Sequence, residues 1–288
     1  MFKVAVIIPV YNAKAFLRKA VESALQFHCV KEVLLIEDAS PDNALELCYI
    51  LAKEDDRVKV FTHPNNENRG AGASRNLGIE KSNCEYIAFL DADDWYLPNR
   101  FDAERIIFQD ENIDGVYGAT GFYYQETDTI APNKLTTVLL KVKQEDLLYE
   151  IVRPYGGRFH TNAITIRKTG LTKTGLFDTN LRLHQDSDLW CKLAFHCRLE
   201  RGIFDKPLSC VRIHENNRII NRNKESLKLY YKKQFDYYLS HKGVQNRVFR
   251  IIFKSYIISK TKSNNNIYRI LNLFFEILKN PKVILKCI

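Results

Sequence analysis

Several features that define other classes of protein are missing from this chain of 288 residues. Its seven cysteines form no C-x-x-C pair, so neither a zinc ribbon nor a thioredoxin-type motif is indicated. No stretch approaches the roughly 18 consecutive apolar residues of a membrane-spanning helix. No internal repeat is present. The remaining possibility is a globular chain, with one large domain or a domain plus an appendage.

The N-terminus also lacks the marks of a secretory leader. The stretch MFKVAVIIPVYN has an apolar run of only about seven residues, with no charged lead and no cleavage site. Several cysteines lie in apolar or helical stretches, where a reduced buried thiol is the usual state. We therefore expect a reducing, cytoplasmic compartment.

Charge is unevenly distributed. From Glu215 to the end there are 16 Lys and Arg against 4 Asp and Glu, whereas the preceding residues carry 27 against 30. The hydrophobic content of 45% is ordinary for a protein with a buried core. The excess positive charge therefore indicates what kind of surface the basic tail could contact, and it carries little information about the fold.

The first hundred residues alternate between two patterns. Short β-branched apolar runs predict strands at 3–9, 32–36, 58–61 and 86–90, and helical spacing predicts helices at 13–26, 42–53 and 70–80. This alternation predicts an open α/β sheet with right-handed crossovers. Ligands of such sheets lie beyond the carboxyl ends of the strands, so Asn12, Asp38 and Asp91 are expected to meet there.

The second half is less regular. Strands are predicted at 115–124, 136–142, 163–167 and 208–213, and a helix at 186–197. Residues 224–288 read as helices rich in Lys, Arg and aromatic residues, interrupted by a linker-like stretch at 261–266.

The stretch FLDADDW places Asp91, Asp93 and Asp94 directly after an apolar run. Carboxylates this close raise each other's pKa unless a cation lies among them, which indicates a metal site. The alternative is a solvated turn with Asp as the turn former. A phosphatase of the haloacid-dehalogenase type is disfavoured, because Trp95 stands where its motif has Thr or Val.

The stretch RGAGASRNLG offers two glycines of a dinucleotide fingerprint. Arg75 stands where the third glycine belongs, and the stretch follows the third strand, so a Rossmann dehydrogenase is disfavoured. Arg75 either reaches a diphosphate or is an ordinary surface arginine.

Four stretches, taken in order, closely resemble the family 2 glycosyltransferases. They are VAVIIPVYNA, EVLLIEDASPDN, NRGAGASRNLGIEKSNCEYIAFLDADDW and FDTNLRLHQDSDLWCKLA. The later VRIHENN fits as well, so the resemblance covers roughly residues 1–216. It implies a GT-A fold, an α/β fold with a central mixed, mainly parallel sheet. We expect a catalytic domain at 1–220 and a helical, basic extension at 221–288.

The resemblance further implies inverting transfer of a sugar from a nucleotide-diphosphate donor, with UDP-hexose or UDP-N-acetylhexosamine favoured. Asp91 and Asp93 match the DxD pair that holds Mg²⁺ or Mn²⁺, with His214 as a possible third ligand. The metal neutralises charge developing on the leaving nucleotide.

The donor contacts implied by the resemblance lie on several loops. Asp38 matches the residue that binds the base or ribose, although Ala39 stands where the family has Gly. For Tyr11 the alternative is plain core packing. The expected donor-binding set is Pro9, Tyr11, Asn12, Asp38, Arg75, Asp91 and Ala92.

HQDSDLW resembles the family's Glu-Asp-x-x-Leu-Trp pattern and places Asp186 at the catalytic base. Such a base takes the acceptor hydroxyl's proton and is worth roughly 10²–10⁴-fold in rate. A compatible alternative is Asp186 as the N-cap of the following helix. Gln185 replaces the usual Glu, and Asp188 is expected to be structural.

The tail raises a separate question. Helical spacing relates Val244, Val248, Ile251, Ile252, Ser255, Ile258 and Ser259, with Arg247, Arg250, Lys254 and Lys260 nearby. A basic amphipathic helix is typical of peripheral binding at the inner face of the cell membrane. The alternative is that its apolar face packs on the catalytic domain. No nucleic acid is expected, because no binding motif accompanies the charge.

Two functional hypotheses follow. The first is a metal-dependent glycosyltransferase acting on a glycan or lipid-linked glycan acceptor in bacterial lipopolysaccharide, capsule or other surface-glycan synthesis. The alternative is a non-catalytic adaptor on the same fold that binds a membrane surface or a partner. The presence of Asp38, Asp91, Asp93, Asp186 and His214 together favours the enzyme.

Overall fold

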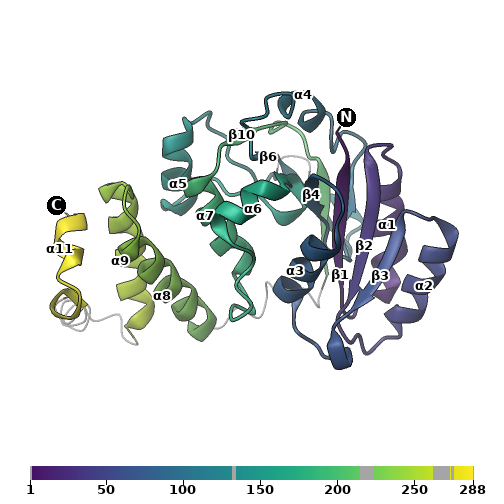
Figure 1. Ribbon diagram of the computed structural model, residues 1–288, viewed down its shortest axis with the longest axis horizontal. Coiled ribbons are helices and arrows are strands. Elements are labelled where there is room, and N and C mark those ends of the chain that lie inside the picture. The colour runs from purple at the N-terminus through teal and green to yellow at the C-terminus, as the bar shows by residue number, and fades with distance from the viewer. Residues whose placement is uncertain (1, 132–133, 215–223, 262–272, 274–275, 288) are drawn as a thin grey trace.

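The computed structural model describes residues 2–131, 134–214, 224–261, 273 and 276–287 (Figure 1). Its centre is a seven-stranded sheet. Every neighbouring pair is parallel except those of β9, which runs antiparallel to β4 and β6. The order is β10 (Leu199–Arg201), β6 (Gly115–Tyr117), β9 (Ile164–Arg167), β4 (Tyr86–Phe89), β1 (Val4–Val10), β2 (Val30–Glu37) and β3 (Val58–Thr62). The mixed, mainly parallel sheet expected from the resemblance is confirmed.

Helices cover both faces of this sheet (Figure 1). α1 (Lys14–Leu25) and α2 (Ala44–Glu54) lie on one face, and α3 (Ala71–Lys81), α6 (Lys168–Thr174) and α7 (Gln185–His196) on the other. β1 therefore buries both of its faces: Val6 joins the core under α1, and Ile7 joins the core under α3. This double burial explains its continuous apolar run. The seven elements predicted up to β4 are confirmed within three residues at their ends.

A smaller sheet lies beside the first, in the order β5 (Trp95–Tyr96), β11 (Ser209–Ile213), β7 (Thr120–Tyr124) and β8 (Thr129–Ile130). The single strand expected at 115–124 is wrong, because β6 and β7 belong to different sheets. The chain leaves the large sheet at Gly118, where a Cβ would lie 2.3 Å from Leu208 Cδ1. The strand expected at 136–142 is also wrong, since only Thr136 forms a bridge there.

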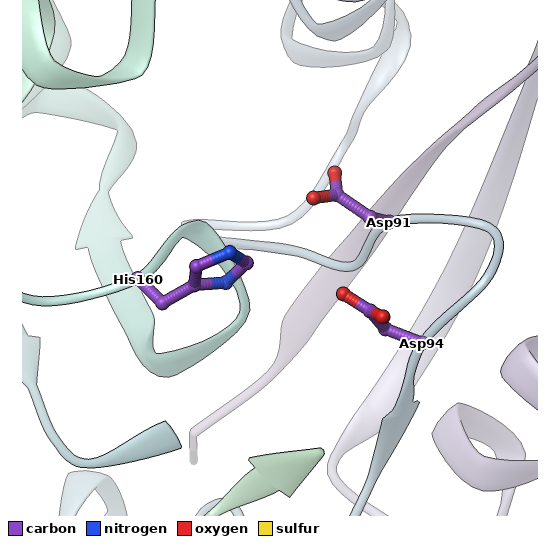
Figure 2. A group of neighbouring side chains, drawn as sticks. All are labelled: Asp91, Asp94 and His160. Carbon is purple, nitrogen blue, oxygen red and sulfur yellow. The ribbon is translucent and has the colours of Figure 1, made fainter. Parts of the chain in front are cut away.

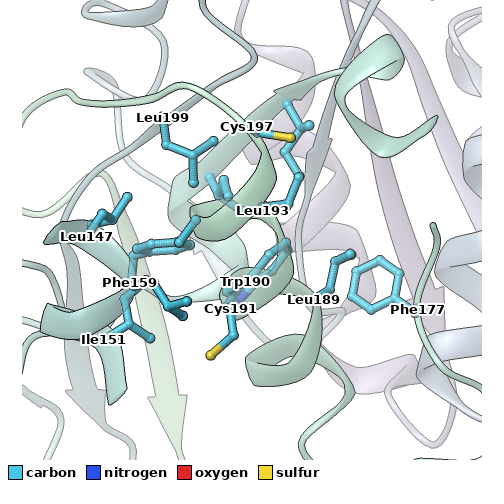
Figure 3. Packing of buried hydrophobic residues seen from close by; sticks show 14 of the residues in the cluster. Leu147, Ile151, Phe159, Phe177, Leu189, Trp190, Cys191, Leu193, Cys197 and Leu199 are labelled. Carbon is cyan, nitrogen blue, oxygen red and sulfur yellow. The ribbon is translucent and has the colours of Figure 1, made fainter. Parts of the chain in front are cut away.

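Among the elements that went unrecognised in the sequence are α4 (Glu104–Ile107), α5 (Gln144–Val152), α6 and β10. α5 packs against α7 and supplies part of the core shown in Figure 3. There the Trp190 ring of α7 lies 5.9 Å from Phe159 and 5.8 Å from Phe177. These aromatic contacts place α7 firmly against the sheet.

The C-terminal helices α8 (Lys224–Ser240), α9 (Asn246–Lys260) and α11 (Lys282–Cys287) stand at the opposite end from β3 (Figure 1). α9 packs against α8, α5 and α11. Its buried stripe is Val248, Phe249, Ile252, Phe253, Tyr256 and Ile257. The buried face of α9 is therefore rotated relative to the face expected from the sequence. That expected face included Ile258, which is 43% exposed. The proposed domain boundary at 220/221 and the linker at 262–266 lie outside the described residues.

Polar contacts also join this extension to the rest of the chain. Arg247 of α9 pairs with Asp146 of α5, and Gln245 Nε2 donates to the carbonyl oxygen of Glu145 at 2.7 Å. The apolar face of α9 thus packs on the rest of the protein. This is the alternative to membrane binding that the sequence left open for the tail. No helix in the described ranges is long and apolar enough to cross a membrane.

Candidate active site

A cavity of about 480 Å³ opens at the carboxyl ends of β1, β2 and β4. It brings together every residue that the sequence singled out for donor binding, metal binding or catalysis. These are Pro9, Tyr11, Asn12, Asp38, Arg75, Asp91, Ala92, Asp93, Asp186 and His214. The juxtaposition expected from the strand ends is therefore confirmed, while the role of each residue stays a prediction.

The acidic loop after β4 is braced from two sides. Asn162 is fully buried: its Oδ1 accepts from the Asp91 backbone N–H at 3.1 Å, and its Nδ2 donates to Asp94 Oδ2 at 2.6 Å. The Arg212 backbone N–H donates to Asp94 Oδ1 at 2.8 Å. With Asp94 only 3% exposed, the solvated-turn alternative is wrong for this residue.

Negative charge accumulates in this loop. Burial and the neighbouring Asp91 raise the pKa of Asp93 despite its hydrogen bond with His214. Burial, Asp93 and Asp91 raise the pKa of Asp94 well above its usual range, despite hydrogen bonds from Arg212 and Asn162. A divalent cation would relieve this repulsion, and carboxylate oxygens are the ligands that Mg²⁺ and Mn²⁺ prefer. The side chains present therefore fit such an ion.

Two sets of candidate ligands share Asp91. In the first, potential ligand atoms of Asp91, Asp94 and His160 lie within 4.8 Å of one another (Figure 2). In the second, the set expected from the sequence, His214 Nε2 lies 3.2 Å from Asp93 Oδ2. The sequence offered no signal for His160, which reaches the site through the short turn η2 (Thr161–Ala163) before β9.

Arg75 lies inside the site. It is 5% exposed, so the surface-arginine alternative is wrong. Its Nη2 lies 2.6 Å from Asp91 Oδ1, and its guanidinium stacks 5.4 Å from the Phe177 ring. Its buried Nε has no hydrogen-bond partner within the described part of the chain. A fixed cation in the cavity wall is suited to an anionic group.

Asp38 organises the loop that leads into α3. Its carboxylate accepts from the backbone N–H groups of Arg69 at 2.7 Å and Gly70 at 2.8 Å. Ala39 follows in the left-handed conformation (φ 55°), which explains why this position favours Gly. Hydrogen bonds from the backbone of residues 39 and 40 to the Glu37 carboxylate hold the loop in this conformation.

The aromatic side chain near this loop is not part of the core. Tyr11 is 40% exposed and lines the cavity, so the core-packing alternative is wrong. The next residue, Asn12, is left-handed (φ 51°), and its backbone N–H donates to Ser40 Oγ at 2.7 Å. The first and second strand-end loops are thereby tied together.

Asp186 lies in the first turn of α7. The N-cap is His184, in the left-handed conformation (φ 64°), so the alternative of Asp186 as N-cap is wrong. The positive end of the helix dipole favours a carboxylate at this place. Gln185 is buried, and we assign its amide nitrogen to the side-chain position that lies 2.8 and 3.0 Å from the carbonyl oxygens of Leu181 and Arg182, because two acceptors there require a donor. A glutamate, lacking a donor when ionised, could not make these bonds.

Asp188 is structural, as expected. It is 1% exposed, and Lys192 Nζ and Gln234 Nε2 donate to its two oxygens at 2.6 and 2.7 Å. The six cysteines whose side chains are described are free thiols, and all but Cys29 are buried.

Comparison with known families agrees with this geometry. Residues 5–169 match the family described as glycosyl transferase family 2, so the chain belongs to that family. An uncharacterized glycosyltransferase of Rickettsia conorii is 32% identical over 242 residues, covering 79% of this chain and 36% of the relative. One of Haemophilus influenzae is 33% identical over 146 residues, covering 50% and 56%. The chain spans about a third of the length of the relatives from Rickettsia conorii, Rickettsia bellii and Rickettsia felis.

Solved structures identify the fold. Residues 1–349 of Staphylococcus aureus TarS in complex with UDP-GlcNAc superpose with a TM-score of 0.65 at 17% identity, covering 97% of this chain and 82% of that one. The mannosyltransferase PcManGT of Pyrobaculum calidifontis, in complex with GDP-Man and Mn²⁺, gives 0.57 at 14% identity, covering 99% and 83%. The chain therefore has the GT-A fold of nucleotide-sugar glycosyltransferases.

Proposed function

We propose that this protein is a metal-dependent, inverting glycosyltransferase that uses a UDP-hexose or UDP-N-acetylhexosamine. The observation that carries the proposal is a single cavity lined by the Asp91–Asp94 loop, Arg75 and Asp186. Family membership favours an enzyme over the non-catalytic adaptor. The bound UDP-GlcNAc of TarS supports UDP as the carrier, and the GDP-Man of PcManGT makes a guanine nucleotide the alternative donor.

The nucleotide half of the donor lies near β1 and β2 in this proposal. Tyr11 packs against the base, and Asp38, through the loop it holds, contacts the base or ribose. Arg75 directs its guanidinium to the diphosphate.

Asp91, Asp93 and His214 would hold Mg²⁺ or Mn²⁺, which supplies positive charge to the leaving diphosphate when bound. Asp186 acts on the acceptor, the second substrate of the reaction. Its carboxylate accepts the proton of the acceptor hydroxyl as that oxygen bonds to the anomeric carbon. The bond to the diphosphate breaks on the opposite face, so the configuration inverts.

The acceptor is a hydroxyl of a glycan or lipid-linked glycan in bacterial lipopolysaccharide, capsule or other surface-glycan synthesis. The bacterial source of the sequence relatives supports this part of the proposal. With the apolar face of α9 buried, contact with an anionic inner membrane surface would use exposed basic side chains such as Lys254.

The test is release of UDP from a panel of UDP-sugars with Mn²⁺, with and without EDTA. Asp186→Asn should lower the rate by roughly 10²-fold or more, because it removes the general base. Asp56→Asn, the same change at an exposed position, serves as the control. Turnover that survives EDTA, or equal rates in the two variants, would contradict the mechanism. Turnover with GDP-sugars alone would correct the donor.

A further inference from the structure

Helix α8 of the C-terminal extension contacts the segment that carries Asp186. The contacts lie on both sides of the start of α7, within α7 and in the turn that precedes it. The pairs nearest to the start of α7 are Gln234 with Asp188, Lys233 with Asp178, and Tyr230 with His184.

The first pair is buried. Gln234 and Asp188 are each 1% exposed, and Gln234 Nε2 donates to Asp188 Oδ1 at 2.7 Å. Lys192 occupies the other carboxylate oxygen from within α7. A buried carboxylate oxygen that loses its donor is left desolvated without a compensating hydrogen bond. Asp188 lies two residues after Asp186. The hydrogen bond between Gln234 and Asp188 therefore holds the first turn of α7 on its buried side.

The other two pairs hold the approach to α7. Lys233 Nζ lies 2.5 Å from Asp178 Oδ2, and both side chains are largely buried. The Tyr230 ring lies 5.3 Å from that of His184, the left-handed N-cap of α7. α8 therefore contacts the chain before, at and after the point where the helix begins.

We propose that α8 positions Asp186 for proton transfer, with Gln234 as the principal positioning residue. This inference rests on the proposed role of Asp186 as general base. A base must lie within hydrogen-bond reach of the acceptor hydroxyl, and a misplacement of about 1 Å can cost roughly 10²-fold in rate. The basic extension is then part of the catalytic unit, and the side-chain contacts given above reach the segment that carries Asp186.

The affinity for UDP is the measurement that separates a positioning role from a general loss of structure. Tyr11, Asp38 and Arg75 lie on β1, β2 and α3, or on the loops after them, and α8 holds a different segment. Gln234→Met keeps the length of the side chain and removes the donor. It should lower kcat by roughly tenfold or more, while UDP affinity stays within about twofold of wild type. Steady-state kinetics and calorimetric titration with UDP measure the two quantities.

A second variant separates positioning from stability. Phe235, the next residue on α8, stacks on Phe253 and Tyr256 of α9 at 5.4 and 4.8 Å. Phe235→Leu should lower Tm and leave kcat unchanged well below the transition. Equal losses of kcat in the two variants, or a wild-type kcat in Gln234→Met, would overturn the proposal.

Hydrogen exchange decides the question without turnover. Backbone amides of residues 188–192, which donate to the carbonyl oxygens of the first turn, should lose protection in Gln234→Met and keep it in Phe235→Leu. Unchanged protection in Gln234→Met overturns the positioning role, whatever the activity. A wild type that releases no nucleotide from any donor overturns the proposed function instead, so the two failures are distinguishable.

Discussion

Asn162 Nδ2 donates to Asp94 Oδ2 at 2.6 Å, and this bond joins the turn before β9 to the acidic loop after β4. The residues are 68 positions apart in the chain, and both are buried. The oxygen of the same amide, Oδ1, accepts from the Asp91 backbone N–H at 3.1 Å. One neutral side chain thus sets the shape of the loop that carries three carboxylates.

We expect Asn162→Asp to destabilise the protein by about 3 kcal/mol, because a carboxylate would face Asp94 without a donor between them. Urea denaturation of the metal-free protein measures the change. Asn112→Asp, the same substitution at an exposed position, should have little effect. Equal midpoints for Asn162→Asp and wild type would refute the bracing role.

Replacing Arg75 should raise the affinity for Mn²⁺ and lower the affinity for UDP. Arg75→Met removes a cation 2.6 Å from Asp91, so Mn²⁺ without nucleotide should bind more tightly by about 1 kcal/mol, roughly fivefold. UDP without metal should bind more weakly, since a diphosphate contact is lost. Calorimetric titrations measure both, with the exposed Arg105→Met as control. A parallel loss of both affinities would indicate misfolding or a different role.

The two candidate ligand sets can be told apart by their histidines. If Asp91, Asp93 and His214 hold the metal, His214→Ala should weaken Mn²⁺ binding by roughly tenfold or more. His160→Ala should leave it within about twofold. Electron paramagnetic resonance of free Mn²⁺ during titration measures both. The reverse order would assign the metal to Asp91, Asp94 and His160.

Glu32 makes stability depend on pH. Burial alone would raise the pKa of Glu32, but hydrogen bonds from Lys59 and Asn83 outweigh it and lower the pKa to about 2. Because the folded value lies below the unfolded value of about 4.5, the ionised carboxylate stabilises the fold above pH 4.5. That stability is lost as pH falls from 4.5 toward 2.

Glu32→Gln should therefore destabilise the protein by about 2 kcal/mol at pH 7, and by progressively less below pH 4.5. Denaturant midpoints of both proteins from pH 7 to pH 3 measure the difference. Glu46→Gln on the exposed side of α2 serves as the control. A difference between wild type and Glu32→Gln that stays constant across this range would contradict the assignment.

Local pattern was sufficient for the first ninety residues and for the principal site. β1 and β2 are buried on both faces, so their apolar runs are continuous, and parallel strands carry their polar successors to one edge. Asn12, Asp38 and Asp91 could therefore be placed together from spacing alone, whereas for Arg75 spacing left a surface position open. The family resemblance added Asp186 and His214, whose positions in the cavity agree with it.

Tertiary structure decided what local pattern leaves open. The break between β6 and β7 depends on the space around Gly118, and the buried stripe of α9 depends on which helices pack against it. His160 and Asn162 stand in an irregular turn with no periodicity of their own. The buried Arg100 supports this turn from a distant part of the chain, since its guanidinium donates to the carbonyl oxygens of Asn162 and Ile164.

The sequence by itself determined the class of fold and the chemistry of the site, because both follow from residue type and from the periodicity of neighbouring residues. Only the tertiary structure decided which side chains hold that chemistry in place. Gln234 meets Asp188 across 46 positions of chain, and nothing local to either residue specifies the other. Contacts of this kind arise from packing between distant elements, which the spacing of residues along one element does not encode.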